Sequence, residues 1–371
     1  MKQGWEIKKL GEVCSIMMGQ SPSSDTYNDS NGLPFFQGNA DFGKIHPKVR
    51  VFCNAPIRIA DVNDILISVR APIGAINIAD CRCCIGRGLA AIRNLDTTIG
   101  AYIYHALITN KEKLIAQGTG STFKSIGREA LKELYIPVPP IEEQERIVAE
   151  LDCLSGIIEK KREQLKEYDA LAESIFYTMF GDPITNEKGW KVKKLGEVCA
   201  FQQGVQVPIE AQFEEQQDGM NRFLRIVDFT QGNEKPRYVH INSEKHILKE
   251  GEIAIVRYGS PGFVCYGKYG VIANNLFKII PLRNNLSYVY FVHWLKSDAF
   301  QSIVSENQYG AALQAIKFST IKDIATILPP ITLQQEFADK IEAIEKQKEL
   351  IKESIKETEE LFNSRMDYYF G

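Results

Sequence analysis

The sequence lacks the segments that would mark a membrane or exported protein. No run of 18 or more apolar residues occurs among its 371 residues, and a bilayer-spanning helix needs about 20. The start, Met-Lys-Gln-Gly-Trp-Glu, has no apolar core of the kind found in signal peptides. We therefore expect no membrane contact, and we expect the eight cysteines to be reduced thiols of a cytoplasmic protein.

Signatures of catalysis are missing as well. No glycine-rich loop ends in Gly-Lys-Ser/Thr, which excludes a P-loop nucleotide site. The segment Val138-Pro-Pro-Ile141 lacks the Asp or Asn that opens the Asp/Asn-Pro-Pro-aromatic motif of amino-methyltransferases. No pair of carboxylates is followed closely by a lysine in a strand context, as a nuclease site would require. We expect a chain without catalytic residues, bound metal or cofactor.

Two sets of residues leave alternatives open. Cys81-Arg-Cys83-Cys84 resembles half of a zinc site, but a structural zinc needs four ligands and no second cluster is apparent, so buried or edge-strand thiols are the alternative. His105 and His293 recur at equivalent positions, either as structural histidines or as catalytic ones. Neither histidine belongs to a recognisable nucleophile or metal motif.

Charge is uneven along the chain, although the net charge is only −3. Residues 1–140 carry 16 Lys and Arg against 12 Asp and Glu (+4), and residues 181–330 carry 17 against 15 (+2). Residues 141–180 carry 5 against 10 (−5), and residues 331–371 carry 6 against 10 (−4). Acidic segments would hide a basic face from a whole-chain count, although differences this small also arise by chance.

What the chain does contain is one unit present twice. The ten residues from Trp5 to Cys14 return as Trp190 to Cys199 with only two changes, at an offset of 185. Further along, Val69-Arg70 matches Val256-Arg257 at an offset of 187, and the offset reaches 190 near the end of each copy. Such small steps are typical of a duplicated unit with short loop insertions.

Each copy ends in a long predicted helix. Apolar residues recur at alternating steps of three and four, which is the heptad pattern of a helix with one apolar seam. Pro-Pro-Ile precedes each helix and Phe-Gly closes it, and proline suits the first helical turn and glycine the stop. At about 1.5 Å per residue, each helix spans roughly 60 Å. The seam residues are Ile147, Leu151, Leu154, Ile158, Leu165, Ile341, Ile344, Ile351, Ile355 and Phe362.

We expect the two seams to pair as an antiparallel coiled coil, with the modules related by a pseudo-two-fold axis. If the helix ends were flush, Lys161 would lie near Ile351 and Lys348 near Leu165. A buried polar residue in a seam fixes the register at a cost in stability. Alternatively, both lysines extend along the edge of the seam to reach water.

The local patterns before each helix predict an α+β fold class with two α/β modules. Short β-rich runs at 64–69 and 252–256 are each followed by a Pro/Gly turn, and short helices are expected at 102–113 and 288–300. The expected domains are a first module at 1–138, a helix at 139–181, a second module at 182–328 and a helix at 329–371.

The glycine-rich loops of the modules carry side chains suited to nucleic acid. Arg and Lys can pair with guanine, Asn and Gln with adenine, and hydroxyls and lysines suit phosphates, although any surface loop contains such residues. The best candidates are Arg70 and Arg257, because both copies carry them, whereas Arg87 is replaced by Asn274. The candidate DNA-binding residues are Gln20, Ser21, Ser23, Ser24, Gln37, Asn39, Arg70, Arg87, Ser121, Thr122, Lys124, Gln202, Gln203, Arg225, Arg257, Tyr258, Ser260, Asn274, Asn275, Gln308, Gln314 and Lys317.

Several motifs together resemble the specificity subunits of type I restriction-modification systems. They are the Trp-x-x-x-x-Leu-Gly-Glu opening of each half, Ile-Pro-Val-Pro-Pro-Ile-x-x-Gln-Glu-Arg-Ile at 136–147, its weaker copy at 327–337, and Met-Phe-Gly-Asp-Pro at 179–183. The resemblance covers the whole chain. It implies two target-recognition domains that each read one half of a bipartite site in double-stranded DNA, joined by two spacer helices.

The resemblance also implies the partners. Modification subunits, expected to be two, would dock on the helices, and restriction subunits would join that complex. S-adenosylmethionine and ATP would belong to these partners, which agrees with the missing catalytic motifs.

Two alternatives stay open: a coiled-coil adaptor without DNA contact, and an orphan DNA methyltransferase. A rod of about 60 Å would limit the half-site separation to roughly 17 base pairs, and about one helical turn is expected.

Overall fold

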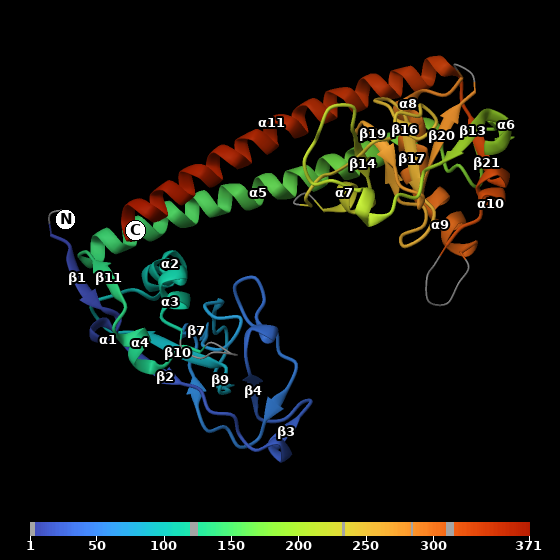
Figure 1. Cartoon of the computed structure of the whole chain (residues 1–371). Helices are drawn as coiled ribbons and strands as arrows, with labels where there is room; N and C mark the ends of the chain where they lie inside the picture. Colours follow the sequence, from blue (N-terminus) through green and yellow to red (C-terminus); the bar gives the residue numbers. More distant parts are fainter. Residues whose placement is uncertain (1–3, 119–124, 232–233, 283–284, 309–314) are drawn as a thin grey trace. The chain divides into compact units, whose positions relative to one another are not determined.

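The computed structural model describes residues 4–118, 125–231, 234–282, 285–308 and 315–371 (Figure 1). The chain forms two compact units: unit 1 comprises Met1–Arg162 with Glu353–Gly371, and unit 2 comprises Glu163–Lys352. Each unit therefore holds one globular module and one part of each 40-residue helix, α5 (Ile141–Phe180) and α11 (Ile331–Phe370). None of the helices in the described ranges is long and apolar enough to cross a membrane.

The module of unit 1 is built on two larger sheets. The first has four strands in the order β2-β10-β7-β8, and the second has five in the order β3-β5-β4-β9-β6. The strands of the first sheet are β2 (Cys14–Met18), β10 (Leu89–Asn94), β7 (Ile65–Ser68) and β8 (Ile76–Ile78). Those of the second are β3 (Tyr27–Asn28), β5 (Phe52–Cys53), β4 (Leu33–Phe36), β9 (Cys83–Ile85) and β6 (Ile59–Ala60). A separate pair, β1 (Glu6–Lys9) with β11 (Tyr135–Val138), leads into α5.

Unit 2 repeats this plan. Its sheets have the orders β13-β20-β17-β18 and β15-β14-β19-β16, with a separate pair of β12 and β21. The first sheet contains β13 (Cys199–Gln203), β20 (Leu276–Pro281), β17 (Ile253–Val256) and β18 (Val264–Cys265). The second contains β15 (Arg237–Val239), β14 (Asn221–Leu224), β19 (Gly270–Ile272) and β16 (Ile247–Leu248), and the pair is β12 (Lys191–Lys194) with β21 (Ala325–Leu328).

The central strand of each module is buried on both faces, which explains its continuous apolar sequence. Ile65 and Ile67 on β7 pack in one cluster with Tyr102 of α2, whereas Leu66 points to the second sheet and packs with Phe36. β17 alternates in the same way between two clusters. The short helices are α1 (Leu10–Val13), α2 (Gly100–Thr109), α3 (Lys111–Ala116) and α4 (Arg128–Lys132) in unit 1, and α6 (Leu195–Val198), α7 (Val227–Thr230), α8 (Tyr288–Lys296), α9 (Asp298–Glu306) and α10 (Phe318–Asp323) in unit 2.

A buried glutamine fastens the start of each long helix to its own module. The side chain of Gln144 accepts a hydrogen bond from the Ile99 backbone N–H (3.1 Å) and donates to the Thr97 and Pro139 carbonyls (3.0 and 2.8 Å). In unit 2, Gln334 makes the matching three bonds to the backbone of Ser287, Asn285 and Pro329. Both glutamines are fully buried. These are the glutamines of the two Pro-Pro-Ile-x-x-Gln motifs.

Within each unit, the parts of α5 and α11 run antiparallel. In unit 1, Glu150 bonds with Arg365 and Tyr369, and further along α5 Lys161 donates to Ser354 and Thr358. The condition of flush ends is not met, because Lys161 lies against Ser354 and Thr358 rather than near Ile351.

In unit 2, Lys348 binds Asp169 (2.7 Å) rather than lying level with Leu165, a shift of about one helical turn in the same direction. The seam residues are buried at Ile147, Leu151, Ile158, Ile341 and Ile344, and half-buried at Leu154, Leu165, Ile351, Ile355 and Phe362. The lysines lie on the seam with polar partners, Lys161 with neutral oxygens and Lys348 with carboxylates.

Candidate functional site

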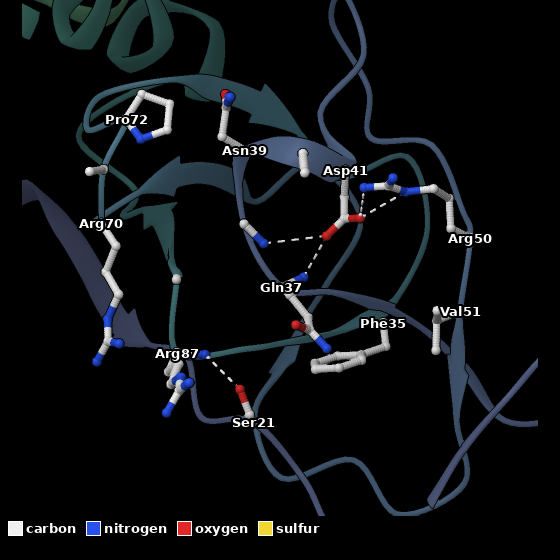
Figure 2. A pocket seen from close by; sticks show the side chains of 14 residues that line it. Ser21, Phe35, Gln37, Asn39, Asp41, Arg50, Val51, Arg70, Pro72 and Arg87 are labelled. Carbon is white, nitrogen blue, oxygen red and sulfur yellow. Dashed lines mark hydrogen bonds and ion pairs between the residues drawn. The ribbon is translucent and has the colours of Figure 1, made fainter. Parts of the chain in front are cut away.

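The chain segments that leave four strands of unit 1 enclose a hollow of about 790 Å³. It lies where the chain leaves β2, β4, β7 and β9, and five of the candidate DNA-binding residues meet there. The lining residues are Ser21, Phe35, Gln37, Gly38, Asn39, Ala40, Asp41, Arg50, Val51, Arg70, Ala71, Pro72, Arg87 and Gly88. Figure 2 shows this pocket from close by.

One carboxylate organises the loop that follows β4. Asp41 accepts hydrogen bonds from the backbone N–H groups of Gln37 (2.7 Å) and Gly38 (3.3 Å). Its other oxygen accepts two bonds from the guanidinium of Arg50, at 3.1 and 2.6 Å. These interactions are drawn in Figure 2. Hydrogen bonds to an ionised acceptor are stronger than those between neutral groups, and these four hold the loop in a fixed shape.

Arg70 and Arg87 bring positive charge to the pocket. Both side chains are exposed, and neither guanidinium makes an ion pair or hydrogen bond with any residue in the described ranges. Figure 2 shows both pointing to the same side of the hollow, with the amide of Gln37 nearby. Two free guanidinium groups beside free amides can serve phosphates, guanine and adenine.

The backbone beneath Arg87 is fixed by close contacts. Its N–H donates to the hydroxyl of Ser21 (3.2 Å). At the next residue, a Cβ on Gly88 would stand 2.2 Å from the Gln37 carbonyl oxygen, so only glycine allows this approach. The loops that carry Arg87 and Gln37 are therefore held against each other.

Unit 2 contains the same frame with different side chains. Asp228 accepts the backbone N–H of Arg225 at 2.9 Å, as Asp41 accepts that of Gln37. The backbone N–H of Ala273 bonds to Leu224 as that of Gly86 bonds to Phe36, which makes Asn274 the counterpart of Arg87. The Asn274 amide lies 3.4 Å from Gln206, whose position matches Ser21.

The expectation that Arg70 and Arg257 are equivalent is wrong. Ser68 pairs with Leu89, and Val256 pairs with Leu276, so the strands β7 and β17 align at an offset of 188. Arg70 then corresponds to Tyr258. Arg257 takes the place of Val69, a buried residue, and its carbonyl accepts the Ile316 N–H as that of Val69 accepts the Ile126 N–H.

Arg257 is held within the module rather than projecting freely. Its guanidinium lies 5.7 Å from the ring centroid of Phe318. Its Nε is buried without a hydrogen-bond partner among the described residues. The Arg257 side chain therefore packs against its own module, whereas that of Arg70 is exposed in the pocket.

Arg225 is also engaged. Its Nε donates to Asp228 (3.0 Å) and its terminal nitrogen to the Lys235 carbonyl (2.9 Å). Although burial raises the pKa of the Asp228 carboxyl, its bonds from Arg225 and Arg222 outweigh that effect and hold the pKa below the usual value. Asp228 is therefore a charged acceptor at neutral pH.

The other candidates of unit 2 are spread over neighbouring loops. Gln203 donates to the Asn274 carbonyl (3.3 Å), which brings these two residues together. Gln202 lies beside Gln203 on β13, and Asn275 follows Asn274. Tyr258 is half-buried, Ser260 is exposed, Gln308 follows α9, and Lys317 is the exposed residue before α10.

In unit 1, Gln20, Ser23 and Ser24 are exposed but do not line the pocket. The predictions for Ser121, Thr122, Lys124 and Gln314 fall outside the described residues. Sequence reasoning missed Asp41, Asp228 and Arg50. The repeat carried a signal for the first two, because Asp41-Phe42 and Asp228-Phe229 match between the copies.

None of the clustered cysteines, nor His105 or His293, lines this pocket. Cys83 and Cys84 are buried on β9, and burial raises the pKa of both thiols. Within the described ranges, no group of three or more His, Cys, Asp or Glu is placed to hold a metal ion. His105 is buried on α2, 3.5 Å from Asp152.

Comparisons with known proteins agree with this architecture. A family model for the type I restriction modification DNA specificity domain matches residues 2–167 and 187–360. The putative type I restriction enzyme MjaX specificity subunit of Methanocaldococcus jannaschii is 40% identical over 177 residues, which are 47% of this chain and 42% of that protein. The chain thus spans less than half the length of this relative.

Two further matches extend along nearly the whole chain. The type I restriction enzyme MjaIX specificity subunit of the same organism is 26% identical over 381 residues, covering 90% of this chain and 85% of that protein. The crystal structure of a type I restriction-modification system S subunit from M. genitalium shares the fold, with a TM-score of 0.56 and 16% identity over 99% of this chain and 96% of that one. The resemblance seen in the motifs is thereby confirmed: the chain belongs to the family of type I restriction-modification DNA specificity domains and carries two copies of the domain.

Proposed function

We propose that this protein is the DNA-recognition subunit of a type I restriction-modification complex. Each module reads one half of a bipartite site in double-stranded DNA, and the chain itself is not catalytic. Methyl transfer with S-adenosylmethionine and ATP-driven restriction belong to partner subunits, with two modification subunits docked on the helices. The family membership and the names of the full-length relatives support this assignment.

The pocket of unit 1 is the observation that carries the proposal. Arg70 and Arg87 have no partner in the described chain, and they line the same pocket as the free amides of Gln37 and Asn39, on loops fixed by hydrogen bonds. Loops of this kind, positioned by a rigid scaffold, are where recognition residues concentrate. In this proposal, Arg87 reads a base edge and Arg70 contacts a base or a phosphate.

The second module reads a different half-site. Asn274 stands where unit 1 has Arg87, and Tyr258 stands where it has Arg70. An amide prefers adenine, whereas an arginine prefers guanine. The exchange of these side chains on a shared frame supports two readers with different sequences.

The helices are proposed to act as an antiparallel spacer that sets the distance between the half-sites and relates the modules by a pseudo-two-fold axis. The antiparallel contacts of α5 and α11 inside each unit support this role. Their acidic outer surface suits docking to basic partners rather than to DNA.

The test of the pocket is the variant Arg87→Ala in the full chain, expressed with its modification subunits. Losing a bidentate base contact costs ~1–3 kcal/mol of discrimination, so methylation should spread to sites altered at one position of one half-site. Sequencing of methylated bases in the host genome measures this.

The control is Arg82→Ala, which removes the same charge from an exposed residue outside the pocket, paired with Asp61 at 3.4 Å. It should leave the methylated sequence unchanged. If Arg87→Ala and Arg82→Ala give the same methylation pattern as the unaltered chain, the pocket does not read DNA.

A further inference from the structure

A buried aspartate lies at the same point of the frame in each module, Asp41 in unit 1 and Asp228 in unit 2. Asp41 is 9% exposed and Asp228 is 3% exposed. Each follows the strand of the second sheet that runs parallel to its neighbour, β4 beside β9 and β14 beside β19. The two aspartates are thus in equivalent places in units that otherwise differ in their loops.

The two carboxylates make the same type of bonds. One oxygen accepts the backbone N–H of the first loop residue, Gln37 at 2.7 Å in unit 1 and Arg225 at 2.9 Å in unit 2. The other oxygen accepts a guanidinium at 2.6 Å, from Arg50 in unit 1 and from Arg222 in unit 2. Because the acceptor is charged and mostly shielded from water, these bonds are stronger than those between neutral groups.

In unit 1, the loop fixed by Asp41 is the one that presents Gln37 and Asn39. The side-chain amides of these two residues make no hydrogen bond to a residue in the described ranges. The Gln37 carbonyl also lies against Gly88, next to Arg87. A shift of this loop would therefore change where two amides stand relative to the free guanidinium of Arg87.

In unit 2, the carboxylate acts on the side chain of the loop residue as well as on its backbone. Nε of Arg225 donates to Asp228 while its terminal nitrogen donates to Lys235. The Asp228 carboxylate therefore fixes the direction of the Arg225 side chain. At the equivalent position in unit 1, the Asp41 carboxylate binds only the backbone of Gln37 and leaves its side chain free.

We propose that Asp41 and Asp228 are positioning residues that determine the base specificity of the two modules, each for its own half-site. The inference rests on the proposed function. In this proposal neither carboxylate is a DNA contact: the Asp228 side chain is fully buried, and both oxygens of Asp41, which reaches the pocket with 12% of its side chain exposed, are already bound by its own loop and Arg50. They act by holding the loop whose side chains do.

The experiment is to express the full chain with Asp41→Asn together with its modification subunits and to map methylated sequences. Asparagine keeps the shape but removes the charge, and its amide cannot accept two N–H groups and a guanidinium as the carboxylate does. We expect one half-site to be relaxed, with discrimination reduced roughly tenfold, while the other half-site is read as before. Asp228→Asn should relax the other half-site only.

The matched control is Asp64→Asn. Asp64 is also buried (3% exposed), accepts a backbone N–H from Asp61 (2.8 Å) and binds Arg93 through two bonds of 2.7 Å, but it does not line the pocket. It should lower the melting temperature and leave both half-sites unchanged. Unchanged methylation specificity at the half-site that the unaltered module reads shows that each variant is folded and assembled.

Three outcomes would overturn the proposal. If Asp41→Asn leaves the methylated sequence unchanged while Arg87→Ala alters it, the pocket reads DNA without help from Asp41. If Asp41→Asn and Asp64→Asn relax the same half-site equally, the effect is one of module stability. If Arg87→Ala itself changes nothing, the proposed function of the pocket fails, and the inference fails with it.

Discussion

His293 illustrates how burial and neighbouring charges change the chemistry of a side chain. It lies on α8 with its ring edge against Phe337, 5.2 Å between centroids. Burial, together with the nearby Lys296 and Lys348, lowers its pKa to about 4, and Glu345 and Asp169 only partly oppose this. The imidazole is therefore neutral in the folded protein at neutral pH.

This predicts a pH dependence of stability. In the unfolded chain a histidine binds a proton at a pKa of about 6.5, so the unfolded state binds more protons between pH 6.5 and 4. The free energy of unfolding must then fall as the pH is lowered through that window, by up to roughly 3 kcal/mol from this residue. Below about pH 4 the folded state binds the proton too, and the contribution stops growing.

The measurement is the melting temperature of the protein and of His293→Gln between pH 4 and 7. The slope against pH should be smaller in the variant. His240→Gln, at an exposed histidine of the same unit, should keep the original slope. Equal slopes in all three proteins would show that His293 binds its proton as readily folded as unfolded.

For single residues, the sequence could identify which side-chain types form the site, but not how the residues of the two copies align with each other. Gln37, Asn39, Arg70 and Arg87 were predicted from loop composition, and the structure brings them together. The match of Arg70 with Arg257 failed because the copies align at an offset of 188 there, rather than 187. In a strand, a shift of one residue moves a side chain to the opposite face, and only the pairing of β7 and β17 with their neighbours determines it.

Among the strands, two ion pairs show that the same interaction can be made from different positions in the two units. In unit 1, Asp64 before β7 binds Arg93 of β10, and in unit 2, Glu252 before β17 binds Lys278 of β20. The acids are equivalent, but the cation has moved by two residues along the neighbouring strand. Because side chains alternate between faces, a step of two keeps the cation on the same face.

The long helices were predictable from the sequence, whereas their alignment was not. The Pro-Pro-Ile and Phe-Gly signals predicted helices whose ends agree with α5 and α11 to within two residues. The shift from flush ends depends on packing inside each unit, where Phe180 meets Phe337 and Tyr369 meets Glu150. No repeating pattern in the helices alone carries that information.

Lys161 and Lys348 are predicted to fix the register of the helix pair. Replacing both by leucine removes polar interactions that only one alignment satisfies and adds apolar side chains to the seam. Asp169 and Glu345, the carboxylates that Lys348 would leave behind, are exposed to water, so losing their cation costs little. We expect Lys161→Leu/Lys348→Leu to keep or raise the melting temperature but to broaden or split the transition seen by calorimetry.

The control is Lys160→Leu/Lys352→Leu, which removes two exposed lysines from the same helices. It should keep a single transition. A sharp single transition in the double variant of Lys161 and Lys348, with unchanged amide-exchange protection along α11, would mean that the apolar residues alone choose the alignment.

At the scale of the whole molecule, the proposed spacer predicts a dependence on helix length. Deleting residues 159–165 of α5 and 352–358 of α11 removes one heptad from each helix at matching heights. The pair would become shorter by about 10 Å, which corresponds to roughly three base pairs. The preferred gap between the half-sites should decrease accordingly, as seen by mapping methylated sites.

Deleting the heptad from α5 alone is the control, since it breaks the pairing and should abolish methylation instead of shifting the gap. An unchanged gap after the double deletion would show that the helices do not measure the distance.

The equivalent glutamines at the starts of the two long helices have a consequence for the exchange of modules between genes. Gln144 and Gln334 each bind three backbone groups of the module that precedes them, so the first turn of each helix is structurally the last part of that module. We therefore expect a gene fragment that encodes a new module to be accepted best when it also encodes this first turn. Because the two glutamines make the same bonds, we expect either position to accept such a fragment, and under the proposed function recombination there would give new combinations of half-sites.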